Sequence, residues 1–176
     1  MIPQSHPEPW ADLRELELPI LSFSGPWFRI HLSKYDPLYF GFTGENRFTA
    51  PAQEYGTLYV GHDEYCAFIE TFGQSTGINT VTSNWLSKRA ISRISSLRSL
   101  RLVDLTGAGL AQIGADARLT TEVPHDVARR WALALWQHPS VPDGICYMES
   151  ATGLGTTPHG SAQLYTIALI MPCDRF

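Results

Sequence analysis

The sequence predicts an α+β fold with a largely antiparallel or mixed sheet and flanking helices. Short runs rich in β-branched and aromatic residues are separated by turn residues, which is typical of strands. Helical patterns are few and do not alternate regularly with these runs, so a parallel βαβ sheet is not expected. With 176 residues, 44% of them hydrophobic, the chain is long enough for one core. We therefore expect a single domain over residues 1–176, with an N-terminal arm (1–24) and a core (27–171).

The first half of the chain contains two predicted strands and a predicted helix. Residues 27–32 alternate in polarity as a half-buried strand does. The expected core-facing side chains are Phe28, Ile30 and Leu32, and those expected on the opposite face are Trp27, Arg29 and His31. Residues 57–61 form a second strand candidate, after which Asp63 is a suitable N-cap for a helix. Apolar residues recur in that helix at i, i+3, i+4 and i+7, namely Tyr65, Phe68, Ile69 and Phe72.

The other elements follow from turn residues and periodicity. Prolines at the start predict a mobile arm or packing strap, and residues 74–87, rich in Thr, Ser, Asn and Gly, predict a loop. The helix pattern is clearest over residues 123–137, with Pro124 in its first turn. We expect about five strands and two or three helices in all. The remaining candidates are a short helix at 11–18 and strands at 88–95, 99–105, 145–150 and 163–171, the last of them central in the sheet.

Composition excludes several classes of function. The net charge of -4 comes from only 17% charged residues without a basic block, which argues against a nucleic-acid surface. Three distant cysteines without a C-x-x-C spacing predict no disulfide framework and no metal site, and favour a reducing cytoplasm. No stretch resembles a signal peptide or a membrane span, so we expect a cytoplasmic protein without a membrane partner. Export by a route without a classical signal stays open.

Familiar catalytic motifs are absent from the sequence. It contains no H-E-x-x-H, no P-loop and no G-x-S-x-G. The run Thr106-Gly107-Ala108-Gly109 after a predicted strand suggests a dinucleotide-binding turn, but Gln112 occupies the third glycine position, so a turn before a short helix is favoured. A triad of Asp143, Ser150 and His159 has no support from spacing.

Five short motifs in order resemble the RES domain family, which is named for an arginine, a glutamate and a serine. The resemblance covers about residues 27–170. The chain departs from the family where Phe48 replaces a tryptophan and where two residues separate Tyr147 from Ser150. The motifs are Trp27-Phe28-Arg29, Glu45-Asn46-Arg47-Phe48-x-x-Pro51, Leu58-Tyr59-Val60, Ala67-Phe68-Ile69-Glu70 and Asp143-Gly144-Ile145-Cys146-Tyr147-Met148-Glu149-Ser150.

This resemblance implies an NAD-degrading toxin of a toxin–antitoxin pair, with a core similar to ADP-ribosyltransferases. NAD would be the substrate, cleaved between nicotinamide and ribose with inorganic phosphate or water as acceptor, and an antitoxin would be the protein partner. Arg29 and Arg47 would bind the diphosphate, because the guanidinium fork pairs with two phosphate oxygens. Glu70 would stabilise the oxocarbenium-like transition state. Tyr59 would contact the nicotinamide, and the Ser150 hydroxyl would hold Arg29 or the ribose.

Two other functions stay open at this point. Transfer of ADP-ribose to a protein would use the same site. A non-catalytic binding module would keep Arg29, Arg47 and Glu70 as a buried ion network. For the enzyme, we expect Arg29 and Ser150 on neighbouring strands. We expect these two residues, Tyr59 and Glu70 to face one cleft.

Overall fold

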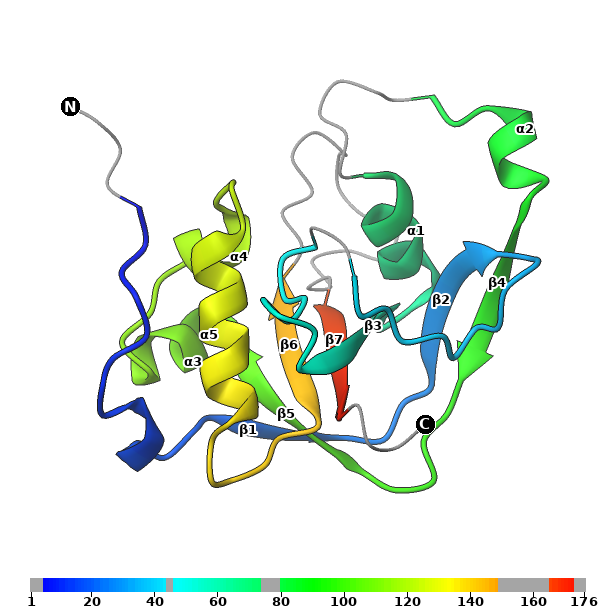
Figure 1. Ribbon diagram of the computed structural model, residues 1–176. Coiled ribbons are helices and arrows are strands. Elements are labelled where there is room, and N and C mark those ends of the chain that lie inside the picture. Colours follow the sequence, from blue (N-terminus) through cyan, green and yellow to red (C-terminus); the bar gives the residue numbers. More distant parts are fainter. Residues whose placement is uncertain (1–4, 44–45, 74–79, 149–164, 173–176) are drawn as a thin grey trace.

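The computed structural model describes residues 5–43, 46–73, 80–148 and 165–172. Within these ranges the chain forms a seven-stranded sheet in the order β1-β5-β6-β7-β3-β2-β4 (Figure 1). Strands β5 and β6 are parallel, and the other neighbouring strands are antiparallel. The predicted α+β class with a mixed sheet is therefore confirmed. The strands are β1 (Ile20–Phe23), β2 (Trp27–Leu32), β3 (Tyr55–Gly61), β4 (Arg89–Ile94), β5 (Leu100–Leu105), β6 (Gly144–Met148) and β7 (Tyr165–Pro172).

Most helices lie where the sequence patterns place them, but several short elements were not predicted. The expected helix at 11–18 is a single 3-10 turn, η1 (Leu13–Glu15), and the expected loop at 74–87 contains α2 (Ser83–Leu86). Strand β1 and helix α4 have four residues each, which is too short for a hydrophobic period to be read from sequence. No helix among the described residues is long and apolar enough to cross a membrane. The other helices are α1 (Glu64–Phe72), α3 (Gly107–Gln112), α4 (Arg118–Thr121) and α5 (Asp126–Trp136).

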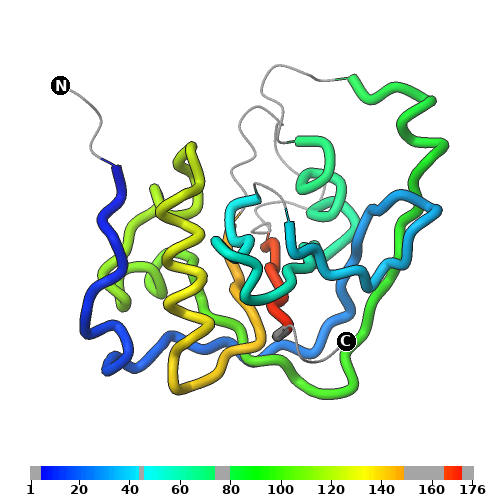
Figure 2. Tube along the Cα trace, in the orientation of Figure 1, coloured from blue at the N-terminus to red at the C-terminus, as the bar shows by residue number. Residues whose placement is uncertain are grey.

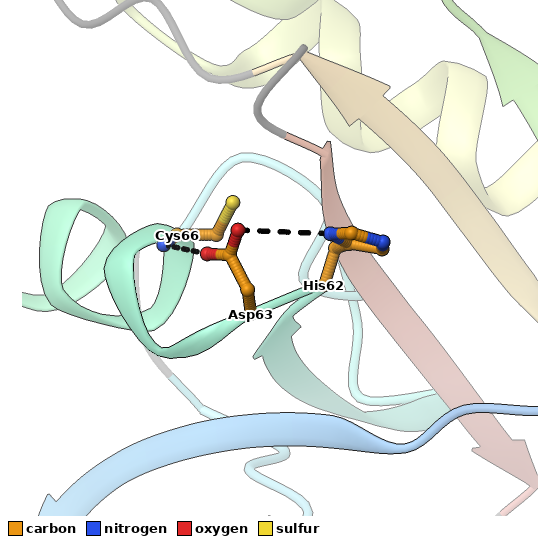
Figure 3. A group of neighbouring side chains, drawn as sticks. All are labelled: His62, Asp63 and Cys66. Carbon is orange, nitrogen blue, oxygen red and sulfur yellow. Dashed lines mark hydrogen bonds and ion pairs between the residues drawn. The ribbon is translucent and has the colours of Figure 1, made fainter. Parts of the chain in front are cut away.

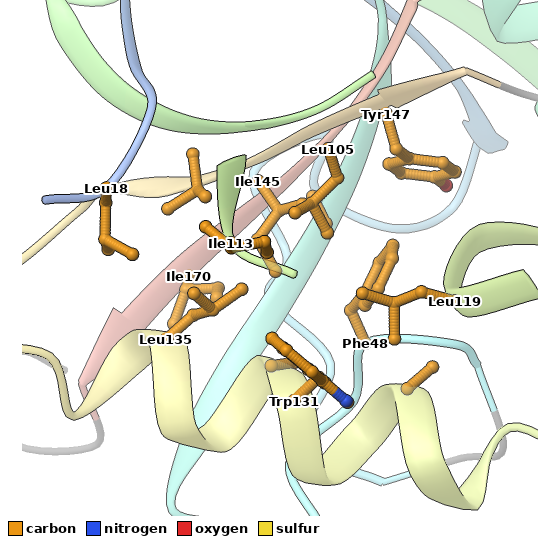
Figure 4. Packing of buried hydrophobic residues seen from close by; sticks show 14 of the residues in the cluster. Leu18, Phe48, Leu105, Ile113, Leu119, Trp131, Leu135, Ile145, Tyr147 and Ile170 are labelled. Atoms are coloured by element: carbon orange, nitrogen blue, oxygen red, sulfur yellow. The ribbon is translucent and has the colours of Figure 1, made fainter. Parts of the chain in front are cut away.

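The larger hydrophobic core lies between α5 and one face of the sheet. Trp131 and Leu135 project from α5 toward Ile145 and Ile170 on the strands, as Figure 4 shows. Trp131, Leu135 and Ile145 are completely buried. The predicted amphipathic helix at 123–137 thus packs as expected, because its apolar stripe covers the sheet.

The N-terminal segment is a packing strap rather than a mobile arm over its described part. Residues 5–10 run beside α5 (Figure 2), where the indole nitrogen of Trp131 donates to the carbonyl of Pro7 at 2.9 Å. His6 is 3% exposed, and its Nε2 accepts a hydrogen bond from the backbone N–H of Asp116. An ion pair between Glu8 and Arg130 adds a third contact at the surface.

The second core corrects the expected orientation of β2. Trp27 and His31, expected on the solvent face, are only 1% and 9% exposed. Trp27 is buried because side chains from both halves of the sheet, among them Leu58 and Ile94, enclose it in a second cluster. His31 forms a hydrogen bond with Ser92 of the neighbouring strand β4. Both faces of β2 are therefore packed.

The sheet is weakly joined between β3 and β2. Phe28 and Gly61 form the one residue pair found between these strands in the described part of the chain. Helix α1 covers this junction and contacts both strands. Gly61 permits the close approach, because a Cβ atom there would lie 2.3 Å from the backbone nitrogen of Ala67. The junction leaves room for a cavity between the strands and α1.

Candidate functional site

A cavity of about 350 Å³ opens where β2 and β3 part. It holds three of the site residues that the sequence predicts, Arg29, Tyr59 and Glu70. Residues from two strands and α1 therefore converge there, although they lie far apart in the sequence. The full lining is Phe28, Arg29, Ile30, Asn46, Tyr59, Val60, Gly61, Ala67, Glu70, Thr71 and Arg89.

Glu70 reaches the cavity from α1, one turn after the buried residues Cys66 and Ala67. Ile69 and Ala67 are buried against the sheet, whereas Glu70 is half-buried. The hydroxyl of Tyr147 donates a hydrogen bond to Oε2 of Glu70 at 3.2 Å. Tyr147 comes from β6 and stacks edge-on against Phe48, with ring centroids 5.0 Å apart. The hydroxyl of Tyr147, on β6, thus orients the carboxylate of Glu70, on α1.

Tyr59 links the cavity to the loop that follows residue 45. Its hydroxyl oxygen accepts the backbone N–H of Phe48 at 2.9 Å. Burial raises the pKa of Tyr59, and the hydrogen bond to Phe48 only partly opposes this shift. The hydroxyl is therefore protonated at neutral pH and remains a hydrogen-bond donor. In this structure Tyr59 fixes the loop, a role that sequence reasoning did not foresee.

Arg29 lines the cavity from β2 and is held by the following loop. One terminal nitrogen, Nη1, donates to the carbonyl oxygens of Pro37 at 2.6 Å and Tyr39 at 3.1 Å. Burial lowers the pKa of Arg29, and the nearby carboxylate of Asp36 partly offsets that effect. A guanidinium has five N–H donors, so these two bonds leave others for a ligand.

Arg47 is not among the residues that line the cavity. Its Nη1 donates to the carbonyl of Glu122 at 2.8 Å, and Arg129 donates to the carbonyl of the neighbouring Asn46 at 3.2 Å. The loop is therefore tied to the end of α4 and to α5 itself. The positive charge of Arg47 still lies close enough to Tyr59 to oppose, in small part, the rise in the pKa of its hydroxyl.

The last predicted site residue, Ser150, lies outside the described residues. The strand that leads to it, β6, is separated from the strand of Arg29 by β7 and β3. The strands of Arg29 and Tyr147 are therefore not neighbours, and the expected place of Ser150 beside Arg29 stays a prediction. The sequence could not show this separation, because β7 follows β6 in the chain but inserts between β6 and β3.

Two of the polar residues that sequence reasoning missed are Tyr147, which contacts Glu70, and Arg89, which lines the cavity. Tyr147 belongs to a recognised motif, but nothing in that motif shows that its hydroxyl reaches Glu70. Arg89 begins β4 and enters the cavity only because β4 pairs with β2. Both contacts depend on strand order, which local patterns do not reveal.

A larger cavity, about 450 Å³, lies away from these residues and is lined by Trp136, Asp143 and Leu169 among others. The carboxylate of Asp143 accepts two hydrogen bonds from Arg98 and one from the backbone N–H of Arg101. Burial tends to raise the pKa of Asp143, but the bonds from Arg98 and Arg101 outweigh it and lower the pKa. Asp143 is therefore a structural anion here.

Potential metal ligands gather at the start of α1 in Figure 3: donor atoms of His62, Asp63 and Cys66 lie within 4.8 Å of one another. Oδ1 of Asp63 accepts the backbone N–H of Cys66 at 2.7 Å, which is the predicted N-cap. Burial, together with hydrogen bonding to Asp63, raises the pKa of the Cys66 thiol to about 12. A metal would require the thiolate. Asp63 of this cluster caps α1. The absence of a metal site stays a prediction.

Replacing the cap residue should weaken the fold. For Asp63→Ala we expect the free energy of unfolding to fall by about 1 kcal/mol, because a backbone donor of α1 loses its acceptor. Urea denaturation followed by circular dichroism measures the change. Asp63→Asn is the matched control, because its amide oxygen still caps the helix. An Asn variant as unstable as the Ala variant would show that the charge, and not the cap, matters.

The comparisons with known proteins agree with this architecture. The family model of the RES domain matches residues 26–154. A search of curated proteins found no match. Among solved structures, a chain in the crystal structure of the M. tuberculosis MbcT–MbcA toxin–antitoxin complex is similar, with a TM-score of 0.66 and 14% identity over 89% of this chain and 79% of that chain. That likeness shows a shared fold. Since the family model spans more than half of the sequence, the chain belongs to the RES domain family.

Proposed function

We propose that this protein degrades NAD as the toxin of a toxin–antitoxin pair. It cleaves the bond between nicotinamide and ribose and passes the ADP-ribosyl group to inorganic phosphate or water. One observation supports this most strongly: in a chain of the RES family, Glu70 is oriented by Tyr147 in the cavity that Arg29 and Tyr59 also line. The whole chain, residues 1–176, works as one RES-type domain in this proposal.

Glu70 is the central catalytic residue. When the glycosidic bond breaks, nicotinamide leaves with the bonding electrons as a neutral base, and positive charge develops on the ribose ring. A carboxylate beside the ribose stabilises that charge, because the interaction strengthens as the bond lengthens. The hydrogen bond from Tyr147 keeps the carboxylate in place before the substrate binds.

The other site residues bind and position NAD. Arg29 contacts the diphosphate through the donors that Pro37 and Tyr39 do not use. Arg47 is assigned a second diphosphate contact, made from the loop that Tyr59 fixes. Tyr59 also presents its ring to the nicotinamide, and Ser150 completes the set as a hydrogen-bond donor to the ribose or to Arg29.

An antitoxin is the proposed protein partner, and it inhibits by covering the cavity. The similarity to a chain of a toxin–antitoxin complex supports this partner. The proposed site of action is the cytoplasm, where NAD is available, and no nucleic acid or membrane takes part.

The decisive experiment is NAD consumption by the purified protein with and without inorganic phosphate, followed by mass spectrometry. We expect free nicotinamide together with ADP-ribose 1″-phosphate or ADP-ribose, depending on the acceptor. Label attached to protein, in place of a free product, would replace this proposal with ADP-ribosyl transfer. Intact NAD after prolonged incubation with folded protein would reduce the site to a binding module.

A further inference from the structure

Arg89 is the one cavity arginine that the sequence did not single out. It opens β4 and pairs with Leu32 of β2, so its side chain lies on the sheet face that also carries Ile30. It lines the same cavity as Arg29 and Glu70. A second arginine, besides Arg29, therefore lines the cavity of the proposed substrate site.

Two aromatic rings hold the guanidinium of Arg89. Its central carbon lies 5.5 Å from the ring centroid of Phe72, at the end of α1, and 5.4 Å from that of Trp85, in α2. Rings at this distance attract a cation through their negative faces. Because the rings form no hydrogen bonds with the guanidinium, they restrict it without using its N–H donors.

The hydrogen bonding of Arg89 is incomplete. Its Nε is buried and has no hydrogen-bond partner, and in the described part of the chain Arg89 forms no ion pair with a carboxylate. A buried donor without an acceptor destabilises the folded state. Arg29 and Arg47 differ, since backbone carbonyls accept their hydrogen bonds. Arg89 is thus the arginine most in need of an external acceptor.

We infer that Arg89, held against the adjacent rings of Phe72 and Trp85, binds a phosphate group in the cavity. A planar guanidinium fork matches two oxygens of a phosphate, and the bond would satisfy the buried Nε. Where the phosphate comes from rests on the proposed function. It is either the diphosphate of NAD or the inorganic phosphate that accepts the ADP-ribosyl group.

Binding measurements on Arg89→Gln test this inference. We expect the dissociation constant of ADP-ribose or of inorganic phosphate to rise by about 10- to 100-fold, as measured by isothermal titration calorimetry. Affinity for nicotinamide riboside, which has no phosphate, should stay unchanged. Arg93→Gln is the matched control, because Arg93 is an exposed arginine on the same strand and the same sheet face.

The two phosphate sources give different results. Weaker ADP-ribose binding and a higher KM for NAD assign Arg89 to the diphosphate. Weaker binding of inorganic phosphate, with a higher KM for that acceptor alone, assigns it to the acceptor. Equal affinities for both probes in Arg89→Gln, Arg93→Gln and wild type would overturn the inference.

A folding defect is separated from a binding defect by Arg89→Lys, which keeps the charge but loses the fork. It should bind the phosphate probe several-fold more weakly than wild type. Wild-type affinity in the Lys variant would count against a phosphate bound by the guanidinium fork. Failure of the proposed function is also distinguishable. Arg89-dependent binding of ADP-ribose without NAD turnover keeps the subsite and removes the enzyme, whereas NAD turnover with unchanged binding in Arg89→Gln does the reverse.

Discussion

Glu70→Gln should reduce NAD consumption by at least about 100-fold while the protein stays folded. The amide has nearly the same shape as the carboxylate, and its oxygen can still accept the hydrogen bond from Tyr147. What the variant loses is the negative charge that balances the developing positive charge on the ribose. The loss should therefore appear mainly in kcat, because the charge acts in the transition state and not in substrate binding.

The measurement is release of nicotinamide over time, with circular dichroism as a check of folding. Glu64→Gln serves as the matched control, because Glu64 is an exposed glutamate in the first turn of the same helix and should keep wild-type turnover. A folded Glu70→Gln protein with full activity would remove Glu70 from the mechanism. Equal losses in both variants would point to the charge of α1 as a whole.

Gly61→Ala should lower both the stability and the activity of the protein. The added Cβ would lie 2.3 Å from the backbone nitrogen of Ala67 and 2.8 Å from the carbonyl oxygen of Asp63. Backbone atoms cannot rotate away, so α1 must move off β3. We expect the free energy of unfolding to fall by about 3 kcal/mol. Because α1 carries Glu70, the folded fraction should also turn over NAD more slowly.

Chemical denaturation and nicotinamide release, measured on the same sample, test the two effects together. Gly41→Ala is the control, because a Cβ there meets nothing closer than 3.9 Å and should change neither quantity by much. Wild-type stability in the Gly61→Ala variant would contradict the tight packing of α1. Lost stability with full activity per folded molecule would instead separate the position of α1 from catalysis.

Local chemistry made the central unit of the fold predictable. Asp63 caps α1 as expected, but the buried face of that helix is only partly the predicted one. Ile69 and Phe72 are buried, whereas Tyr65 and Phe68 are only partly so. Tyr59 falls on β3 as its β-branched neighbours indicate. These features depend on residues within a few positions of one another, which is the range over which a sequence pattern is informative.

The rest of the site depends on contacts between distant segments. The partner of Arg47 is a carbonyl 75 residues away, and Tyr147 lies 77 residues from Glu70. In β4, Arg89 and Arg93 are four residues apart on one face, and only the position of α1 and α2 decides which of them borders the cavity. Burial of Trp27 depends in the same way on how the two halves of the sheet meet.

The place of β7 has a consequence for the synthesis of the protein. It lies between β6 and β3, yet it follows both in the chain, so Tyr147 and Glu70 are joined through a strand that the ribosome makes last of the seven described strands. The elements made earlier can form local structure, but β6 and β3 cannot be joined in one sheet before β7 is available. A nascent chain that has not yet released residues 165–172 therefore lacks the strand that joins β6, with Tyr147, to the half of the sheet that carries the cavity.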